Sequence, residues 1–565
     1  MLDFKEYIVD KIKGTEIDLE TEKINELIEI PPNDEMGDFA FPCFQLAKVL
    51  RKNPALIAEE LAENIEKDSM IQNVEVKGAY VNFFLSKEAY FKTVFEEIRS
   101  QENFGARNTG EGKNMIVEFS STNIAKPFHI GHIRSTVIGN AINNILRYEN
   151  YNTTSINYLG DYGTQFGMMI SAYRKWGDRD KINQDPIQEL LNLYVKYNKM
   201  AKEDDNLMEE ARYWFDQLEQ KNPEAVELWQ WFKEISLEEF KRTYKLLGVE
   251  FDSYNGEAFH SQFMEEAIKE LEDKNLLEES EGAIIVNLED ENLPPVLVKK
   301  SNGSSTYITR DIATAIYRKK EYAFDKNVYV VASQQNLHFQ QLKAVLKKMG
   351  YSWADDCIHV SFGMISMKDG AMKTREGKVI FLENVLKKAV DKTLDIINER
   401  NPELENKEQV AKDVGVGAVI FQDLFNNRVK DYEFDWDQVL NFDGETGPYV
   451  QYTHARSCSI LTKGGGDYDK AVREDLLTSE EEVQIAKLLY DFPRVIQDAI
   501  EKYEPSFVTR YAVNLSSAFN KFYNACPILS EEKELRDARL FLTYSVNKVL
   551  KIALGLIGLQ SPQKM

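Results

Sequence analysis

The sequence predicts an α/β protein in which a parallel sheet is followed by an all-α region. From Asn114 the pattern alternates: an apolar run at 115–120, helical spacing up to Tyr148, and a second strand at 153–159. This βαβ unit indicates a Rossmann-like parallel sheet that binds ligands at the carboxyl ends of its strands. A charged helical stretch at about 171–280 interrupts the alternation as an insertion would.

Three domains are expected, because 565 residues are too many for one compact core. Residues 1–110 predict an N-terminal α+β domain, 111–385 the parallel-sheet domain with its insertion, and 386–565 a C-terminal all-α bundle. The segment 105–113, which contains three glycines, is a plausible linker.

Within the first domain, helical patterns at 41–50 and 57–65 precede strands at 74–76 and 80–84. Further strand signals occur in the second domain at 283–288, 328–332, 358–362 and 379–382. After Leu382 helices dominate, with a flexible loop expected at 463–467.

Composition excludes several classes of protein. A formal charge of −24 argues against a wholly basic nucleic-acid coat, although a local basic track is compatible with it. The four cysteines form no CxxC pair or metal-ligand cluster, so neither structural zinc nor a disulfide framework is expected. The charged start and the lack of an apolar run of about 18 residues indicate a reducing, cytoplasmic protein without a membrane segment.

The most informative stretch is the strand-to-helix turn at 117–135. Such a turn presents free N–H groups and the positive end of a helix dipole, which suits phosphate. His129 and His132 can donate hydrogen bonds there, Gly131 permits close approach of a ligand, and Lys126 adds a cation. The alternative is that both histidines merely begin a helix, but the surrounding sequence favours the phosphate site.

The tetrapeptide His129-Ile130-Gly131-His132 resembles the HIGH signature of class I aminoacyl-tRNA synthetases. The longer stretch from Val117 to Thr136 resembles arginyl-tRNA synthetases, particularly their eukaryotic-type branch. Further matches follow in family order, at 160–167, 307–313, 335–339 and 447–456.

This resemblance implies that the second domain is catalytic. ATP and L-arginine would give arginyl-adenylate and pyrophosphate, and arginine would then pass to the 3′ end of tRNA(Arg). Mg²⁺ would accompany ATP, but the sequence offers no dedicated all-protein site for a metal. Lys126, His129 and His132 would be catalytic, and with Gly131 they would also bind ATP.

Carried over by motif, the arginine-binding residues would be Glu118, Asn123, Tyr307, Asp311 and Gln335. Carboxylates in the plane of a guanidinium distinguish arginine from lysine better than negative charge alone. For Tyr307 and Asp311 the alternative is an ordinary helix start, with the carboxylate placed there by the helix dipole.

The chain departs from the family at its second ATP motif, KMSKS. The usual lysines are replaced by Ala371 and Thr374. Related proteins with a degenerate loop are thought to use the lysine before HIGH, here Lys126, with Lys373 or Arg375 assisting. The other ATP-binding positions are Met364, Met372, Lys373 and Arg375, and the alternative is that 369–378 is only a polar loop.

Transfer RNA would contact both flanking domains. Tyr80 and Asn82 match positions of the family's additional domain that contact the D-loop, and Tyr449, Tyr452 and Arg456 match its anticodon-binding bundle. These tyrosines could instead belong to the protein core. Because tRNA is a polyanion, positive potential must gather on one face of this acidic chain.

Two other functions remain open from the sequence. A synthetase-like protein could bind tRNA or regulate without activating arginine, or the chain could be another nucleotidyltransferase with a HIGH motif. The intact HIGH sequence argues against the first, and the all-α C-terminal region argues against the second. The family is usually monomeric, so a monomer is expected.

Overall fold

The computed structural model describes residues 1–565 except 16–18, 127, 302, 368–379 and 466–469. The chain folds into two compact units, each assembled from segments distant in sequence. Unit 1 comprises Met1–Gly105, Arg456–Pro493 and Asn514–Leu550, and unit 2 comprises Ala106–Ala455, Arg494–Val513 and Lys551–Met565. None of the described helices is long and apolar enough to cross a membrane.

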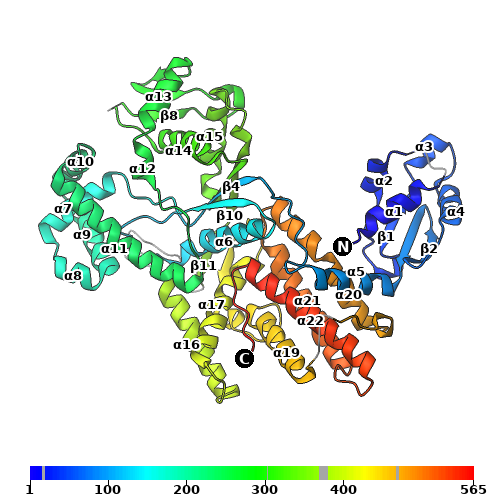
Figure 1. The fold of residues 1–565 in the computed structure, drawn as a ribbon. Coiled ribbons are helices and arrows are strands. Elements are labelled where there is room, and N and C mark those ends of the chain that lie inside the picture. Colours follow the sequence, from blue (N-terminus) through cyan, green and yellow to red (C-terminus); the bar gives the residue numbers. More distant parts are fainter. Residues whose placement is uncertain (16–18, 127, 302, 368–379, 466–469) are drawn as a thin grey trace. The chain divides into compact units, whose positions relative to one another are not determined.

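A parallel sheet of four strands organises unit 2 (Figure 1). Its order is β10-β9-β4-β5, with β4 (Asn114–Glu118), β5 (Asn152–Ile156), β9 (Lys326–Ala332) and β10 (Cys357–Phe362). Glu118 pairs with Ile156 on one side and with Tyr329 on the other. The carboxyl ends of β4 and β9 therefore flank a topological switch point, where open α/β sheets bind ligands.

The sequence of β4 explains its central place. Met115, Ile116 and Val117 are all buried, so both faces of the strand are covered, as in other parallel sheets. Helix α6 (Ile133–Tyr148) leads from β4 to β5. It packs closely because Gly139 has no Cβ: a Cβ there would lie 2.2 Å from the Cβ of Phe119. The predicted Rossmann-like sheet is confirmed.

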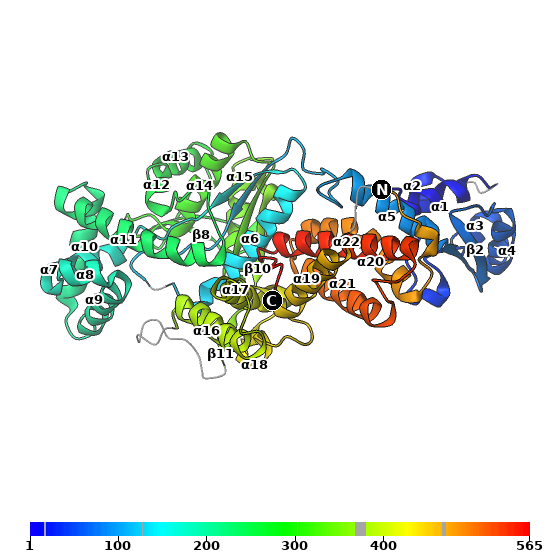
Figure 2. The same cartoon turned by 60° about the horizontal axis from the view of Figure 1, so that its bottom comes forward.

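Helices follow β5 and cover the predicted insertion, although they begin before residue 171. They are α7 (Thr164–Trp176), α8 (Arg179–Gln184), α9 (Pro186–Met200), α10 (Asp205–Glu219), α11 (Pro223–Leu247), α12 (Glu257–Ser261) and α13 (Met264–Asp273). Figures 1 and 2 both show α7, α8, α9 and α10 gathered in one group.

A small antiparallel sheet precedes β9. It consists of β6 (Glu278–Ser280), β7 (Ala283–Val286) and β8 (Val296–Lys299), so the strand predicted at 283–288 does not join the parallel sheet. Helix α14 (Tyr307–Tyr322) packs against β8, and α15 (Asn336–Lys348) connects β9 to β10.

After β10, β11 (Ile365–Met367) pairs in parallel with β12 (Tyr432–Phe434). The strand β12 was not expected in the predicted all-α region. Of the strand predicted at 379–382, residue 379 lies outside the described residues, Phe381 forms an isolated bridge with His129, and Leu382 begins a helix.

Helices otherwise dominate the rest of the chain, which confirms the helical C-terminal region. They are α16 (Leu382–Arg400), α17 (Lys407–Phe425), α18 (Trp436–Val439), α19 (Gly447–Gly464), α20 (Glu480–Glu501), α21 (Ser506–Ala525) and α22 (Lys533–Leu556). The predicted loop at 463–467 falls partly on residues that the structure does not describe.

The N-terminal segment of unit 1 has an antiparallel sheet with the order β1-β3-β2. Its strands are β1 (Phe39–Pro42), β2 (Ile71–Lys77) and β3 (Tyr80–Leu85), and its helices are α1 (Phe4–Lys13), α2 (Thr21–Leu27), α3 (Leu46–Leu50), α4 (Pro54–Asn64) and α5 (Lys87–Ser100). The helix predicted at 41–50 is wrong at its start, because Phe41 and Pro42 belong to β1. A short apolar run does not distinguish a strand from a helix.

The close approach of α6 to Phe119 predicts that Gly139→Ala lowers the free energy of unfolding by about 1–3 kcal/mol, because the added methyl overpacks the core. Gly555→Ala is the matched control: no atom lies within 4 Å of its added Cβ, so a gain of up to about 1 kcal/mol is expected from helix propensity. Denaturant unfolding of both variants measures the difference. Equal midpoints would contradict the proposed packing.

Candidate active site

The candidate site begins where β4 ends. The backbone then passes through three non-glycine residues with positive φ, namely Ser120 (72°), Ser121 (44°) and Ala125 (60°). Such residues cost free energy and persist only where surrounding contacts hold them. The Ser120 amide donates to Ser135 Oγ at 2.9 Å, and the Ser120 and Thr136 hydroxyl oxygens lie 2.8 Å apart. The first turn of α6 therefore fixes the turn after β4.

Two histidines cap the short 3-10 helix η2 (Ile130–His132), which leads into α6. His129 Nδ1 accepts the Gly131 amide hydrogen at 3.0 Å, and His132 Nδ1 accepts that of His129 at 3.2 Å. Their ring centroids are 3.9 Å apart. Because each Nδ1 is an acceptor, a neutral ring carries its proton on Nε2. The pair thus offers two neighbouring hydrogen-bond donors to an anionic ligand.

The charge of this turn resides on Lys126 rather than on the histidines. Burial lowers the pKa of His129 to about 4 and that of His132 to about 3, and Lys126 contributes to both shifts. Both rings are therefore neutral at pH 7. The Lys126 ammonium lies 5.5 Å from the centroid of the Tyr194 ring, which comes from the helical insertion.

Asn123 brings two of the sequence motifs together. Its neighbour Ile124 donates an amide hydrogen bond to the carbonyl of Gly160 at 3.1 Å. A Cβ on Gly160 would lie only 2.4 Å from Asn123 Oδ1, so a glycine is needed for this contact. The segment that begins at Gly160 is thereby held beside the turn between β4 and α6, residues 119–132, which carries both histidines and is named the histidine turn.

Glu118 already has a guanidinium partner within the chain. Its Oε2 lies 2.6 Å from Nη2 of Arg318 on α14, and the side chains are only 7% and 0% exposed. Burial raises the pKa of the Glu118 carboxyl, and Arg318 opposes this shift. Burial by itself would lower the pKa of Arg318, but Glu118 raises it by more, so the net shift is upward.

Asp311 is the more accessible carboxylate. Its side chain on α14 is 26% exposed, and its Oδ2 lies 2.6 Å from Nε2 of His338 on α15. Tyr158 donates a hydrogen bond to the other oxygen at 3.3 Å. Burial lowers the pKa of His338, but Asp311 raises it by more, so the net shift is upward.

The two remaining arginine-pocket candidates lie at the starts of helices. Tyr307 is the first residue of α14 and is 71% exposed. Gln335 ends the 3-10 helix η4 (Ser333–Gln335) after β9 and is also exposed. Tyr307 is therefore on the helix that carries Asp311, and Gln335 directly precedes the helix that carries His338, the partner of Asp311.

Met364 precedes β11 and is 42% exposed. Its amide donates to Asp431 Oδ1 at 2.6 Å. The other predicted ATP-binding residues, Met372, Lys373 and Arg375, lie outside the described residues.

The predicted tRNA-binding residues differ in exposure. In β3, Tyr80 is half-buried and packs edge to face on Phe44, whereas Asn82 is only 4% exposed. In α19, Tyr449 is half-buried and Tyr452 is 40% exposed. Arg456, also in α19, donates a hydrogen bond to Asn520.

Sequence reasoning missed several residues near Asp311. His338 stands in the stretch 335–339 that was recognised, and Arg318 follows Asp311 at helical spacing, but neither pattern identifies a partner. A third group is Glu257 on α12, whose Oε2 lies 3.3 Å from Nη1 of Arg310. Burial raises the pKa of the Glu257 carboxyl to about 7.

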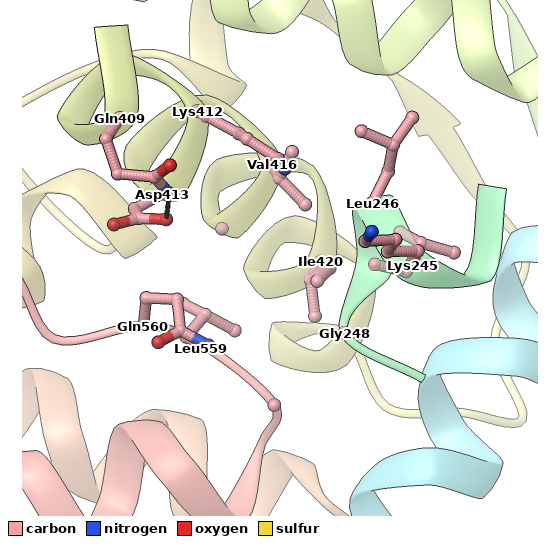
Figure 3. Close-up of a pocket in the computed structure, with 13 residues that line it drawn as sticks. Lys245, Leu246, Gly248, Gln409, Lys412, Asp413, Val416, Ile420, Leu559 and Gln560 are labelled. Atoms are coloured by element: carbon pink, nitrogen blue, oxygen red, sulfur yellow. Dashed lines mark hydrogen bonds between the residues drawn. The ribbon is translucent and has the colours of Figure 1, made fainter. Parts of the chain in front are cut away.

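A pocket of about 220 Å³ lies elsewhere in unit 2, between the end of α11, α17 and residues 558–560 (Figure 3). Its lining includes Lys245, Lys412 and Asp413, and none of the predicted site residues. Among the described residues, no group of three or more His, Cys, Asp or Glu side chains is arranged to hold a metal ion.

Three family models match the chain. They describe the class I (R) tRNA synthetase catalytic domain at residues 94–436, the DALR anticodon-binding domain at 450–565 and the arginyl-tRNA synthetase N-terminal domain at 3–85. The arginine–tRNA ligases of Halothermothrix orenii and Clostridioides difficile are 55% and 51% identical over the full length of both chains. This chain belongs to the arginyl-tRNA synthetase family.

Solved structures agree with this assignment to the arginyl-tRNA synthetases. The Thermus thermophilus arginyl-tRNA synthetase superposes with a TM-score of 0.79 at 25% identity, covering 100% of this chain and 99% of its own. The Plasmodium falciparum enzyme has the same fold, with a TM-score of 0.82 at 24% identity and the same coverage. The expected eukaryotic-type branch is not supported, because the relatives at 51–55% identity are bacterial.

The six histidines give a direct test of the electrostatics. Burial lowers the pKa of His129, His132, His260, His359 and His454, whereas that of His338 is raised by Asp311. An NMR titration of ¹³C-labelled histidine should show one signal with a pKa above about 6.5, which is lost in His338→Gln. Two or more such signals would contradict this description.

Proposed function

We propose that this chain attaches arginine to tRNA(Arg) in two steps. The arginine carboxylate attacks the α-phosphorus of ATP, a new O–P bond forms, and pyrophosphate leaves. A hydroxyl at the 3′ end of tRNA then attacks the activated carbonyl carbon, and AMP leaves. The observation that carries this proposal is the histidine turn at the switch point of the sheet, in a chain 55% identical to an arginine–tRNA ligase.

ATP is proposed to lie on the histidine turn. The Nε2–H groups of His129 and His132 would donate to phosphate oxygens, and Gly131 leaves room for close approach. Lys126 would add the positive charge that the neutral rings lack. Since no covalent enzyme intermediate is required, the chain contributes positioning and stabilisation of developing charge.

Arginine is proposed to bind beside α14. Asp311 is the more accessible carboxylate and would pair with the substrate guanidinium, and Tyr307 and Gln335 would complete the pocket with Asn123. Glu118 would act mainly by holding Arg318, because its carboxylate is already paired. An empty or mismatched pocket leaves a carboxylate without its partner, which disfavours apolar amino acids.

Several further assignments remain proposals. Residues 1–110 would bind the tRNA D-loop, 111–385 would catalyse and 386–565 would bind the anticodon. The three family matches support this order of domains, although the catalytic match extends to residue 436. Tyr80 and Tyr452 have ring surface for stacking on bases, whereas the buried Asn82 offers little. We also propose a cytoplasmic monomer that uses Mg²⁺ bound to ATP.

Charging of bulk tRNA with radiolabelled amino acids tests the function. We expect incorporation of arginine, with lysine and glutamate as controls near background. tRNA binding without any arginine incorporation would instead support a binding or regulatory protein. Exchange measurements should include tRNA, because members of this family typically need it for activation.

Lys126→Ala tests how the chain compensates for its altered second ATP motif. Because Lys126 is proposed to supply charge at the phosphates, we expect arginine-dependent ATP–pyrophosphate exchange with tRNA to fall by about 100-fold. Lys196→Ala is the control, because Lys196 also lies over an aromatic ring, that of Trp176, within the helical insertion. Near-normal exchange in Lys126→Ala would refute this role.

A further inference from the structure

The histidine turn is followed by a buried arginine, Arg134, whose side chain is 1% exposed. Its Nη1 donates to the carbonyl oxygens of Gly363 at 2.9 Å and Lys430 at 2.8 Å. Its Nε lies 3.1 Å from Oδ1 of Asp423 on α17, which is also buried. This single side chain of α6 therefore contacts three separate segments of unit 2.

Two of these segments lead into β11 and β12. Gly363 precedes Met364, whose amide donates to Asp431 Oδ1 at 2.6 Å and whose carbonyl accepts the Tyr432 amide at 3.1 Å. Arg134 also lies over the Tyr432 ring, with its guanidinium carbon 5.1 Å from the centroid. Arg134 thereby joins the backbone around Met364 to the start of α6.

Arginine suits this position better than lysine or an apolar residue. A planar guanidinium can reach two carbonyl oxygens and a carboxylate in fixed directions, whereas an ammonium group is a single point of charge. Apolar residues often stabilise a protein as well as a buried ion pair does. Stability alone therefore does not explain this pair, but a requirement for fixed geometry does.

We propose that Arg134 is a positioning residue for adenylation, which holds Met364 at a fixed place relative to His129 and His132. Met364 and the two histidines would then keep a fixed geometry toward each other when ATP binds. This inference rests on the proposed function, because it takes Met364 and both histidines as ATP-binding residues.

Three variants probe this junction. Arg134→Lys keeps the charge but loses the planar group, and Asp423→Asn keeps the shape of the partner but removes its charge. Gly363→Ala leaves Arg134 intact but places a Cβ 2.6 Å from Asp431 Oδ1, which must displace the same turn. Ile145→Val is the matched control: Ile145 is buried on the same helix, about three turns further along.

Steady-state charging assays should separate positioning from stability. For Arg134→Lys and Gly363→Ala we expect the KM for ATP to rise about tenfold, with the KM for arginine within about twofold of wild type. Asp423→Asn should change in the same direction by less. A purely structural role predicts a lower kcat that follows the folded fraction with KM unchanged, as in Ile145→Val, and that result would overturn the proposal.

Hydrogen–deuterium exchange provides a readout that does not depend on activity. The amides of Met364 and Tyr432 should exchange faster in Arg134→Lys, and at the wild-type rate in Ile145→Val. Unchanged exchange in Arg134→Lys would refute the positioning role even if charging is impaired. If the wild-type chain fails to charge tRNA with arginine, the proposed function fails separately. If Arg134→Lys does not fold, Gly363→Ala decides by the same two measurements.

Discussion

The buried ion pair between Glu118 and Arg318 determines how the site is built. It joins the end of the central strand β4 to α14, with the participating side chains 7% and 0% exposed. Removing either partner would leave an uncompensated buried charge, which costs about 3–5 kcal/mol. The same helix carries Asp311, so its position relative to β4 depends on this pair. Because Glu118 is buried against Arg318, Asp311, which is 26% exposed beside His338, is the more accessible carboxylate for a cationic ligand.

The first turn of α6 holds the turn that carries His129 and His132 in place. Arg134 contacts the segments before β11 and β12, Ser135 donates to the Val330 carbonyl of β9 at 2.7 Å, and Thr136 lies beside Ser120. Adjacent residues on one helical turn thus contact different segments of unit 2. A turn with three positive-φ residues is stable only in such surroundings, so the geometry of the histidines follows from contacts outside their own motif.

Local patterns in the sequence were sufficient for the βαβ unit, for the strands β9 and β10 and for the helical C-terminal region. They were insufficient where the outcome depends on distant partners. Phe41 and Pro42 form a strand because β3 pairs with them, and β7 pairs with β6 and β8 instead of joining the parallel sheet. Likewise, Glu118 and Arg318 are 200 residues apart, and periodicity carries no information about such a pairing.

The charge state of the histidine turn bears on how the altered second ATP motif can be tolerated. Two protonated imidazoles so close together and largely buried would repel each other, and burial keeps both neutral. Neutral donors still orient phosphate oxygens, but they add no formal charge as pyrophosphate leaves. With Ala371 and Thr374 in place of the usual lysines, more of that charge must come from cations elsewhere. Lys126 is close enough to shift the pKa of both histidines, so its field already reaches the place where ATP is proposed to bind.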